Sequence, residues 1–317
     1  MTTGTTRLGI GLAAVARPAY ITSGRAADLG ARRSVEDLRA RTEAVLDAAY
    51  AAGIRYIDVA RSYGRAEEFL AGWLARHPEV DDVEIGSKWG YRYVGDWRVD
   101  APVHEVKDHS VAAFTEQLAE TAALLGPRLG VYHVHSATLD TGALDDAALH
   151  RELARLRDRG VRVGVSTSGP AQADAVRRAL EIEVGGAPLF TSIQSTWNVL
   201  EPSVGPALAE AAAAGARVIV KEAVANGRLT PGAPDAPPLA VEIAAELGIP
   251  LDQLAIAAAL AQPGAWRVLS GAVDPAQVAS NAAAADVALP GDALERLAAV
   301  AEEPGAYWAA RSARSWS

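Results

Sequence analysis

The sequence predicts an α/β fold, and within that class a (β/α)8 barrel (a TIM barrel). Short apolar runs rich in β-branched residues alternate with longer amphipathic segments eight times along the 317 residues. Strands and helices repeated in this order favour a parallel sheet, and eight such units can close into a ring. Three helical segments end on a glycine before the next strand, at Gly53, Gly160 and Gly215, as helices often do.

The strands are expected at eight apolar segments, in this order: 7–12, 54–58, 83–88, 129–135, 161–166, 190–194, 216–221 and 267–271. Each is followed by a segment in which apolar residues recur every three or four positions, the pattern of a helix with one buried face. We expect these helices at 36–52, 66–76, 110–125, 146–159, 170–182, 203–214, 239–262 with a break at Gly248–Pro250, and 275–284. One domain is expected to cover residues 1–317.

A doubly wound open sheet is the alternative arrangement of the same elements. When such a sheet binds a dinucleotide, three glycines normally follow its first strand. Here Gly9 and Gly11 are followed by Leu-Ala-Ala-Val, without a third glycine at the right spacing. The closed barrel is therefore favoured.

Two connections, 89–109 and 222–238, are longer than ordinary loops between a strand and a helix. Both follow the carboxyl end of a strand, which is the face where barrels bind their ligands. We expect the aromatic loop 89–109 and the tail 302–317 to lie over that face. The aromatic side chains predicted to wall a pocket there are Tyr20, Trp89, Tyr91, Trp97, Trp197 and Trp308.

Composition excludes several classes of protein. The net charge is −9 and no basic stripe is present, which argues against nucleic acid or an anionic membrane as a partner. There is no apolar run of about 18 residues and no signal-peptide pattern at the start, so we expect a cytoplasmic protein. Because the chain has no cysteine, it has no disulfide, thiolate metal site or cysteine nucleophile. Nothing in the sequence indicates the oligomeric state.

Polar residues stand at the carboxyl ends of the predicted strands and should converge at one face of a barrel. Among them are Asp58, Lys88 and His135, and Tyr63 lies on the loop just after Asp58. Lysine is scarce in this chain, at positions 88, 107 and 221, which makes a lysine at a strand end notable. A phenol, an ammonium, a carboxylate and an imidazole in one cavity form an acid–base set.

The chemistry of this set points to a carbonyl group. A tyrosine with its ordinary pKa near 10 is a weak acid at neutral pH. A nearby ammonium lowers the pKa of the phenol, and a carboxylate keeps the ammonium in place and charged. The phenol can then protonate a carbonyl oxygen that the imidazole orients. Because none of these groups stores electrons, a cofactor must supply the hydride.

Six segments together resemble the aldo-keto reductase superfamily, and the likeness runs from about residue 7 to residue 290. They are YIDVARSYG (56–64), GSKWG (86–90), LGVYHVHS (129–136), GVSTSG (164–169), SIQSTWN (192–198) and LSGAVDPAQVASN (269–281). The resemblance implies a catalytic tetrad of Asp58, Tyr63, Lys88 and His135. In it Tyr63 is the general acid/base, Lys88 and Asp58 tune it, and His135 orients the carbonyl.

The resemblance also implies a nicotinamide dinucleotide, NAD(H) or NADP(H), bound in extended form. Ser166 and Gln194 would hold its carboxamide, and the loops after the last two strands its pyrophosphate and adenosine. The cofactor-binding residues implied in this way are Ser166, Thr167, Gln194, Lys221, Ala223, Gly227, Ser270, Gly271, Asp274, Gln277 and Asn281. The implied substrate is a small carbonyl compound or sugar.

Departures from the family pattern bear on the cofactor. Thr167 stands where asparagine is common, and Lys221 stands where many members have an aromatic residue that stacks on nicotinamide. Lys221 is expected either to neutralise a cofactor phosphate or to pair with Glu222. Asp274 and Gln277 occupy positions where NADP-preferring members carry basic residues. Because an aspartate repels a 2′-phosphate but accepts a hydrogen bond from a 2′-hydroxyl, NAD(H) is weakly favoured.

Three other functions stay open. A sugar dehydrogenase that works in the oxidative direction uses the same residues, and the NAD-leaning segment mildly favours it. A non-catalytic, cofactor-sensing binding protein of the same superfamily is the second. The third is a metal-dependent hydrolase built on the H-x-H pair His133 and His135, which needs further histidines on later strands. Those are missing, so we expect no metal.

Overall fold

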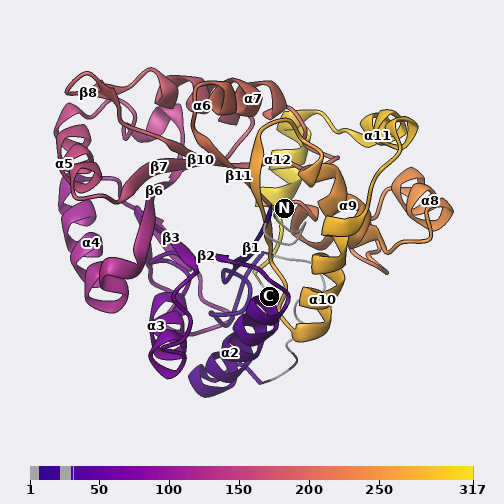
Figure 1. Ribbon diagram of the computed structural model, residues 1–317, viewed down its shortest axis with the longest axis horizontal. Helices are drawn as coiled ribbons and strands as arrows, with labels where there is room; N and C mark the ends of the chain where they lie inside the picture. The colour runs from indigo at the N-terminus through magenta and orange to yellow at the C-terminus, as the bar shows by residue number, and fades with distance from the viewer. Residues whose placement is uncertain (1–6, 22–29, 31, 317) are drawn as a thin grey trace.

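The computed structural model describes residues 7–21, 30 and 32–316. Eight parallel strands close into a barrel, and helices lie outside the ring (Figure 1). The strands are β1 (Leu8–Gly11), β2 (Tyr56–Asp58), β3 (Glu84–Trp89), β6 (Leu129–Ala137), β7 (Arg162–Thr167), β10 (Ser192–Thr196), β11 (Arg217–Lys221) and β12 (Ala265–Ser270). Each lies beside the next strand along the chain, and β12 pairs with β1. The predicted (β/α)8 barrel is confirmed.

The helices between the strands agree with the periodicity of the sequence. They are α2 (Val35–Ala51), α3 (Ala66–Arg76), α4 (Val111–Leu125), α5 (Ala147–Asp158), α6 (Gln172–Leu180), α7 (Gly205–Ala213), α8 (Pro238–Glu246), α9 (Leu251–Leu260) and α10 (Pro275–Ala283). The predicted break at Gly248–Pro250 separates α8 from α9. Gly53, Gly160 and Gly215 have φ of +82°, +91° and +85°, as glycines that end helices do.

Inside the barrel, side chains stack in layers because alternate residues of a strand face inward. Ile219 packs in the middle layer with Tyr56, Val131 and Leu269. This layer is dense: a Cβ on Gly86 would lie 2.1 Å from the Tyr56 hydroxyl oxygen. The next inward positions toward the carboxyl ends are polar. The middle layer therefore forms an apolar floor below the strand ends.

The connections between the barrel elements and the C-terminal part of the chain contain structure that the sequence did not predict. The 89–109 segment holds the antiparallel hairpin of β4 (Tyr91–Tyr93) and β5 (Glu105–Lys107), and a second small hairpin joins β8 (Glu183–Val184) to β9 (Ala187–Pro188). Two further helices, α11 (Gly291–Leu297) and α12 (Pro304–Ser312), follow α10. Figure 1 shows α12, in yellow, beside β11.

No single helix among the described residues has the length and hydropathy needed to cross a membrane. α8 and α9 pass that test together, as a pair bent by 90°.

Candidate active site

A cavity of about 390 Å³ opens at the carboxyl ends of the strands. The last residues of β2, β11 and β12, which are Asp58, Lys221 and Ser270, all line it. Further parts of the wall come from the loop after β1, from the β4–β5 hairpin, from the connection 222–238 and from the chain around α12. Both long segments predicted to lie over this face, 89–109 and the tail, therefore contribute to the cavity.

A buried ion pair lies at the base of this cavity. Lys88 and Asp58 form it through Nζ and Oδ2, and Lys88 Nζ also donates to the carbonyl oxygen of Val59 at 3.1 Å. Gln194 Nε2 donates to the other carboxylate oxygen of Asp58 at 2.8 Å. The Lys88 side chain is 0% exposed and that of Asp58 3%. Two donors therefore fix the orientation of the Asp58 carboxylate.

Tyr63 and His135 lie next to this pair and line the cavity. Lys88 Nζ is 4.9 Å from the centroid of the Tyr63 ring. The rings of Tyr63 and His135 meet edge to face with centroids 5.5 Å apart. The structure thus brings the four side chains of the predicted catalytic tetrad together at one end of one cavity.

Burial raises the pKa of Tyr63 well above its usual value, and the charge of Asp58 raises it further. This differs from the expectation that a nearby ammonium lowers it. The positive charge of Lys88 is neutralised by direct contact with Asp58, so the cost of desolvating the phenolate dominates. Tyr63 therefore keeps its proton at neutral pH.

His135 is a neutral imidazole at the same pH. Burial lowers its pKa well below the usual value, and the positive charges of Lys88 and Lys221 lower it further. A neutral imidazole carries one N–H, which it can donate to a ligand oxygen.

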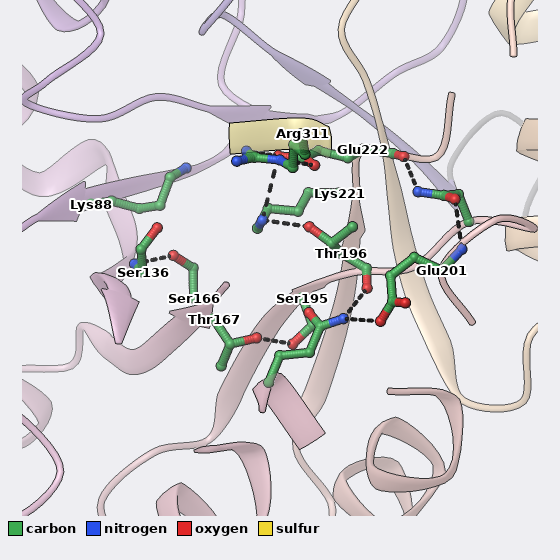
Figure 2. A network of polar contacts seen from close by, with 12 residues as sticks. Lys88, Ser136, Ser166, Thr167, Ser195, Thr196, Glu201, Lys221, Glu222 and Arg311 are labelled. Carbon is green, nitrogen blue, oxygen red and sulfur yellow. Dashed lines mark hydrogen bonds and ion pairs between the residues drawn. The ribbon is translucent and has the colours of Figure 1, made fainter. Parts of the chain in front are cut away.

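Lys221 lies in a second group of charges inside the cavity (Figure 2). Its Nζ donates to Thr196 Oγ1 at 2.7 Å and lies 3.7 Å from Glu222 Oε1. Arg311 from α12 holds both carboxylate oxygens of Glu222. Burial lowers the pKa of Lys221 to about 8. Of the two roles expected for Lys221, the geometry shows the pairing with Glu222.

The ion pair between Glu222 and α12 should make the free energy of unfolding depend on pH in the acid range. Burial alone would raise the pKa of Glu222, but Arg311 and Lys221 lower it from 4.5 to about 2. When folding lowers the pKa of a carboxyl group, its charge stabilises the fold at any pH above the pKa of the unfolded chain. This stabilisation is lost as the pH falls toward the pKa of the folded protein. We expect Glu222→Gln to lower the free energy of unfolding by about 3 kcal/mol at neutral pH.

Urea unfolding of both proteins near pH 7 and near pH 3 checks this. The difference in free energy between wild type and variant should shrink at the lower pH. An equal difference at both values would contradict the prediction.

The predicted cofactor-binding residues fall into two groups. Gln194, Lys221, Ser270 and Gly271 line the cavity. Ser166 is buried beside it, and its Oγ accepts from the Ser136 amide at 2.9 Å (Figure 2). The remaining residues stand around this lining and do not belong to it: Thr167, Ala223, Gly227, Asp274, Gln277 and Asn281.

The segment predicted to bind the adenosine of the cofactor lies at the start of α10, and hydrogen bonds from its own side chains stabilise it. Asp274 caps the helix by accepting from the Gln277 amide at 2.9 Å. Gln277 Oε1 accepts from the Val273 amide at 3.0 Å. Asn281 Oδ1 accepts from Ser270 Oγ at 2.7 Å, which ties this helix to the cavity wall.

Strand alternation turns two of the predicted site residues away from the cavity. Lys88 faces into the barrel, so its neighbour Trp89 faces outward, where it packs edge-on against Phe114 of α4 with ring centroids 5.1 Å apart. Thr167 follows the inward position 166 and likewise faces outward, to bond Ser195 Oγ at 2.7 Å. Neither residue lines the cavity.

Three further tryptophans lie outside the cavity wall. Trp97 donates to the carbonyl oxygen of Arg33 at 2.9 Å and packs near Phe69 of α3. Trp197 is 5% exposed and Trp308 is 4% exposed, and both belong to the main hydrophobic core. These side chains are packed where the loop and α12 lie against the barrel, and they therefore do not face the cavity. Tyr20 and Tyr91 do line the cavity, as predicted.

Several cavity residues were not among the predicted site residues. They are Arg17, Glu105, Ser168, Glu222, Asn226, Arg311 and Trp316. They come from loops, from the β4–β5 hairpin, from the terminal helix and from the tail. Such segments carry no periodic pattern that indicates which side chain turns toward the cavity.

Unused hydrogen-bonding groups in the wall fit a carboxamide-bearing cofactor. Within the described residues, no partner reaches the buried oxygens Gln194 Oε1 and Asn226 Oδ1, and both residues line the cavity. Buried acceptors of this kind are normally satisfied, and a carboxamide N–H₂ or a ribose hydroxyl can satisfy them. The donor and acceptor set is therefore compatible with a nicotinamide dinucleotide.

His133 of the H-x-H pair lies apart from the cavity wall. It is 0% exposed, and its Nε2 lies 2.9 Å from Ser192 Oγ. Across the part of the chain that the structure describes, no group of three or more His, Cys, Asp and Glu side chains is arranged to hold a metal ion.

A model of the aldo/keto reductase family matches residues 26–302. The chain belongs to this family. Members catalyse nicotinamide-dependent oxidation and reduction of small carbonyl compounds or sugars, so membership implies an oxidoreductase. A comparison with curated proteins returns no match.

Solved aldo-keto reductase structures share the fold. Aldo-keto reductase AKR11C1 from Bacillus halodurans, in its holo form, superposes with a TM-score of 0.70 at 20% identity, over 96% of each chain. Glycerol dehydrogenase AKR11B4 from Gluconobacter oxydans gives a TM-score of 0.67 at 22% identity, over 93% of this chain and 90% of its own. At these identities the likeness supports the barrel.

Proposed function

We propose that this aldo-keto reductase transfers hydride between a nicotinamide cofactor and an aldehyde or ketone, with Tyr63 as the general acid/base. One observation carries the proposal: the Tyr63 phenol, the His135 imidazole and the buried Lys88–Asp58 pair meet at one end of the cavity. This arrangement can protonate a carbonyl oxygen while its carbon accepts hydride.

The side chains divide the work in the following way. Tyr63 donates its proton to the carbonyl oxygen, and His135 donates its N–H to the same oxygen and orients it. Lys88, fixed by Asp58, stabilises the phenolate left behind. The cofactor, when bound, supplies the hydride. In the reverse direction the phenolate takes the proton from the alcohol. Because the pKa of Tyr63 is raised, the phenol holds the proton that reduction needs at neutral pH.

Four residues of the wall are the best candidates to hold the cofactor. Gln194 and Asn226 offer the unused acceptors described above. Ser270 and Gly271 end β12 at the cavity, and a Cβ on Gly271 would meet nothing within 4 Å, which leaves room for a ligand to approach the backbone. A fluorescence titration with NADH and NADPH, followed by a panel of aldehydes, ketones and sugars, tests the assignment. A protein that binds neither cofactor would refute it.

We expect a preference for NAD(H). The Asp274 carboxylate at the start of α10 repels a 2′-phosphate, whereas it can accept from a 2′-hydroxyl. The kcat/KM with NADH should exceed that with NADPH by about tenfold or more, which corresponds to about 1.4 kcal/mol. Steady-state kinetics with both cofactors measure this ratio. Higher kcat/KM with NADPH would contradict the prediction.

Oxidation of a polyhydroxylated substrate is the second candidate function. The cavity wall carries Arg17, Glu105, Glu222 and Arg311, which offer donors and acceptors for several hydroxyl groups. Glycerol dehydrogenase is the name of one structural neighbour. Turnover of sugars or polyols with oxidised cofactor, faster than turnover of simple aldehydes in reverse, would favour this function. Cytoplasmic location and the absence of nucleic-acid and membrane partners stay predictions.

A further inference from the structure

A second ion pair, between Arg17 and Glu105, contacts the ring of Tyr63. Arg17 lies in the loop after β1 and is 1% exposed. Its Cζ is 5.1 Å from the centroid of the Tyr63 ring, close to the 4.9 Å of Lys88 Nζ from the same centroid. Arg17 Nη1 bonds Glu105 Oε1 at 2.6 Å. Each of two cations beside the phenol ring therefore has its own carboxylate partner.

The local backbone is shaped for this approach. Arg17 Nη1 donates to the carbonyl oxygen of Ser62 at 3.1 Å, one residue before Tyr63. Gly64, one residue after it, has φ of +60°, and a Cβ there would lie 2.8 Å from Arg17 Cβ. The loop after β1 thus packs directly on the turn that carries Tyr63, with no room for a larger residue.

Aromatic rings surround the guanidinium group. Its Cζ lies 4.5 Å from the ring centroid of Tyr20 and 4.9 Å from that of Trp316. These contacts help to bury the guanidinium group, whose side chain is 2% exposed, and charge interactions strengthen when water is excluded. Glu105 belongs to β5 and Trp316 to the tail. The β4–β5 hairpin and the tail therefore both contact Arg17.

The groups that face Tyr63 are Asp58, Tyr20, Arg17, Glu105, Lys88 and His135. Burial and the charges of Asp58 and Glu105 raise the pKa of its phenol, whereas Arg17 lowers it. Lys88 and Asp58 are in direct contact, and their opposite charges have opposite effects on the phenol of Tyr63. The two charges of the second pair also act on the phenol with opposite signs.

We propose that Arg17 and Glu105 are positioning residues for proton transfer by Tyr63, with Arg17 favouring the phenolate and Glu105 opposing it. This inference rests on the proposed function. In this proposal the β4–β5 hairpin and the tail influence proton transfer by Tyr63, because the hairpin supplies Glu105 and the tail supplies the Trp316 ring that covers Arg17.

The test compares Arg17→Met and Glu105→Gln, with Arg17→Lys as the conservative variant. Arg177→Met, which breaks an exposed ion pair between α6 and α7, is the matched control. The readout is the pH profile of kcat/KM for alcohol oxidation, where Tyr63 must be deprotonated. We expect Arg17→Met to move the rising limb by about one unit to higher pH, and Glu105→Gln to move it to lower pH.

Arg17→Lys should restore most of the wild-type profile, and Arg177→Met should leave it unchanged. Phenolate absorbance titrations, each corrected with Tyr63→Phe in the same background, should give the same shifts without turnover. If the pair had only a structural role, Arg17→Met and Glu105→Gln would shift the pH profile in the same direction, or would change KM alone. Either result overturns the inference. If Arg17→Met fails to fold, Glu105→Gln still decides it. Turnover retained by Tyr63→Phe would instead refute the proposed function.

Discussion

Replacing Tyr63 with phenylalanine should lower turnover by about 10³-fold while leaving cofactor binding nearly intact. The substitution removes one hydroxyl group and keeps the ring, so its contacts with Lys88, Arg17 and His135 remain. Without the hydroxyl, the side chain at position 63 can no longer give a proton to a carbonyl oxygen that His135 orients.

Steady-state kinetics measure turnover, and fluorescence titration with the reduced cofactor measures binding. Tyr50→Phe on α2, far from the cavity, is the matched control and should keep wild-type kcat. Wild-type turnover in Tyr63→Phe would refute the role of the phenol. Turnover and cofactor binding lost together would point to a structural defect.

Breaking the buried Lys88–Asp58 pair should have the largest effect on stability. Both side chains are almost fully buried, so Lys88→Met or Asp58→Asn leaves an unpaired group inside the barrel. Losses of this kind amount to about 3–5 kcal/mol. The double variant Lys88→Met/Asp58→Asn removes both charges and should recover part of that loss. All three variants should lose most of their activity, because the phenol loses its stabilising cation or the group that holds it.

Urea unfolding gives the free energies of unfolding, and kcat/KM reports the activity. A single variant as stable as wild type would show that the pair is dispensable for folding. A double variant less stable than both single variants would contradict the electrostatic explanation. Recovery of stability without recovery of activity is the expected pattern.

The regular parts of this protein could be predicted from its sequence. The eight strands follow from apolar runs, and the position of Asp58, Lys88 and His135 follows from their place at strand ends. Parallel strands in a barrel bring their carboxyl ends to one face. That rule brings Asp58, Lys88 and His135 of the predicted tetrad together without knowledge of any contact, and Tyr63 comes with them because its loop begins directly after Asp58.

Side-chain direction also follows from the strands, and the prediction for Trp89 did not use it. Since Lys88 faces inward, alternation sends Trp89 outward to α4. The same rule places Thr167 outward, against Ser195. For Trp97 and Trp308 no such rule exists, because loop and terminal-helix positions depend on how those segments pack.

Arg17, Arg311 and Trp316 belong to the cavity for reasons that lie outside any local pattern. Arg311 reaches Glu222 across 89 positions of sequence, and Trp316 stacks on His104 with ring centroids 4.3 Å apart. The raised pKa of Tyr63 was also missed, because arithmetic on charges alone leaves out the desolvation of a buried phenolate.

The most direct test of the central claim follows the hydride itself. The protein is mixed with nicotinamide cofactor that carries deuterium at the transferring position and with an aldehyde that it turns over. Mass spectrometry of the alcohol then shows where the deuterium goes. Direct transfer predicts one deuterium on the former carbonyl carbon and a matching loss of reduced cofactor, both slowed by about 10³-fold in Tyr63→Phe. Alcohol formed without deuterium, or no consumption of reduced cofactor, would contradict the account.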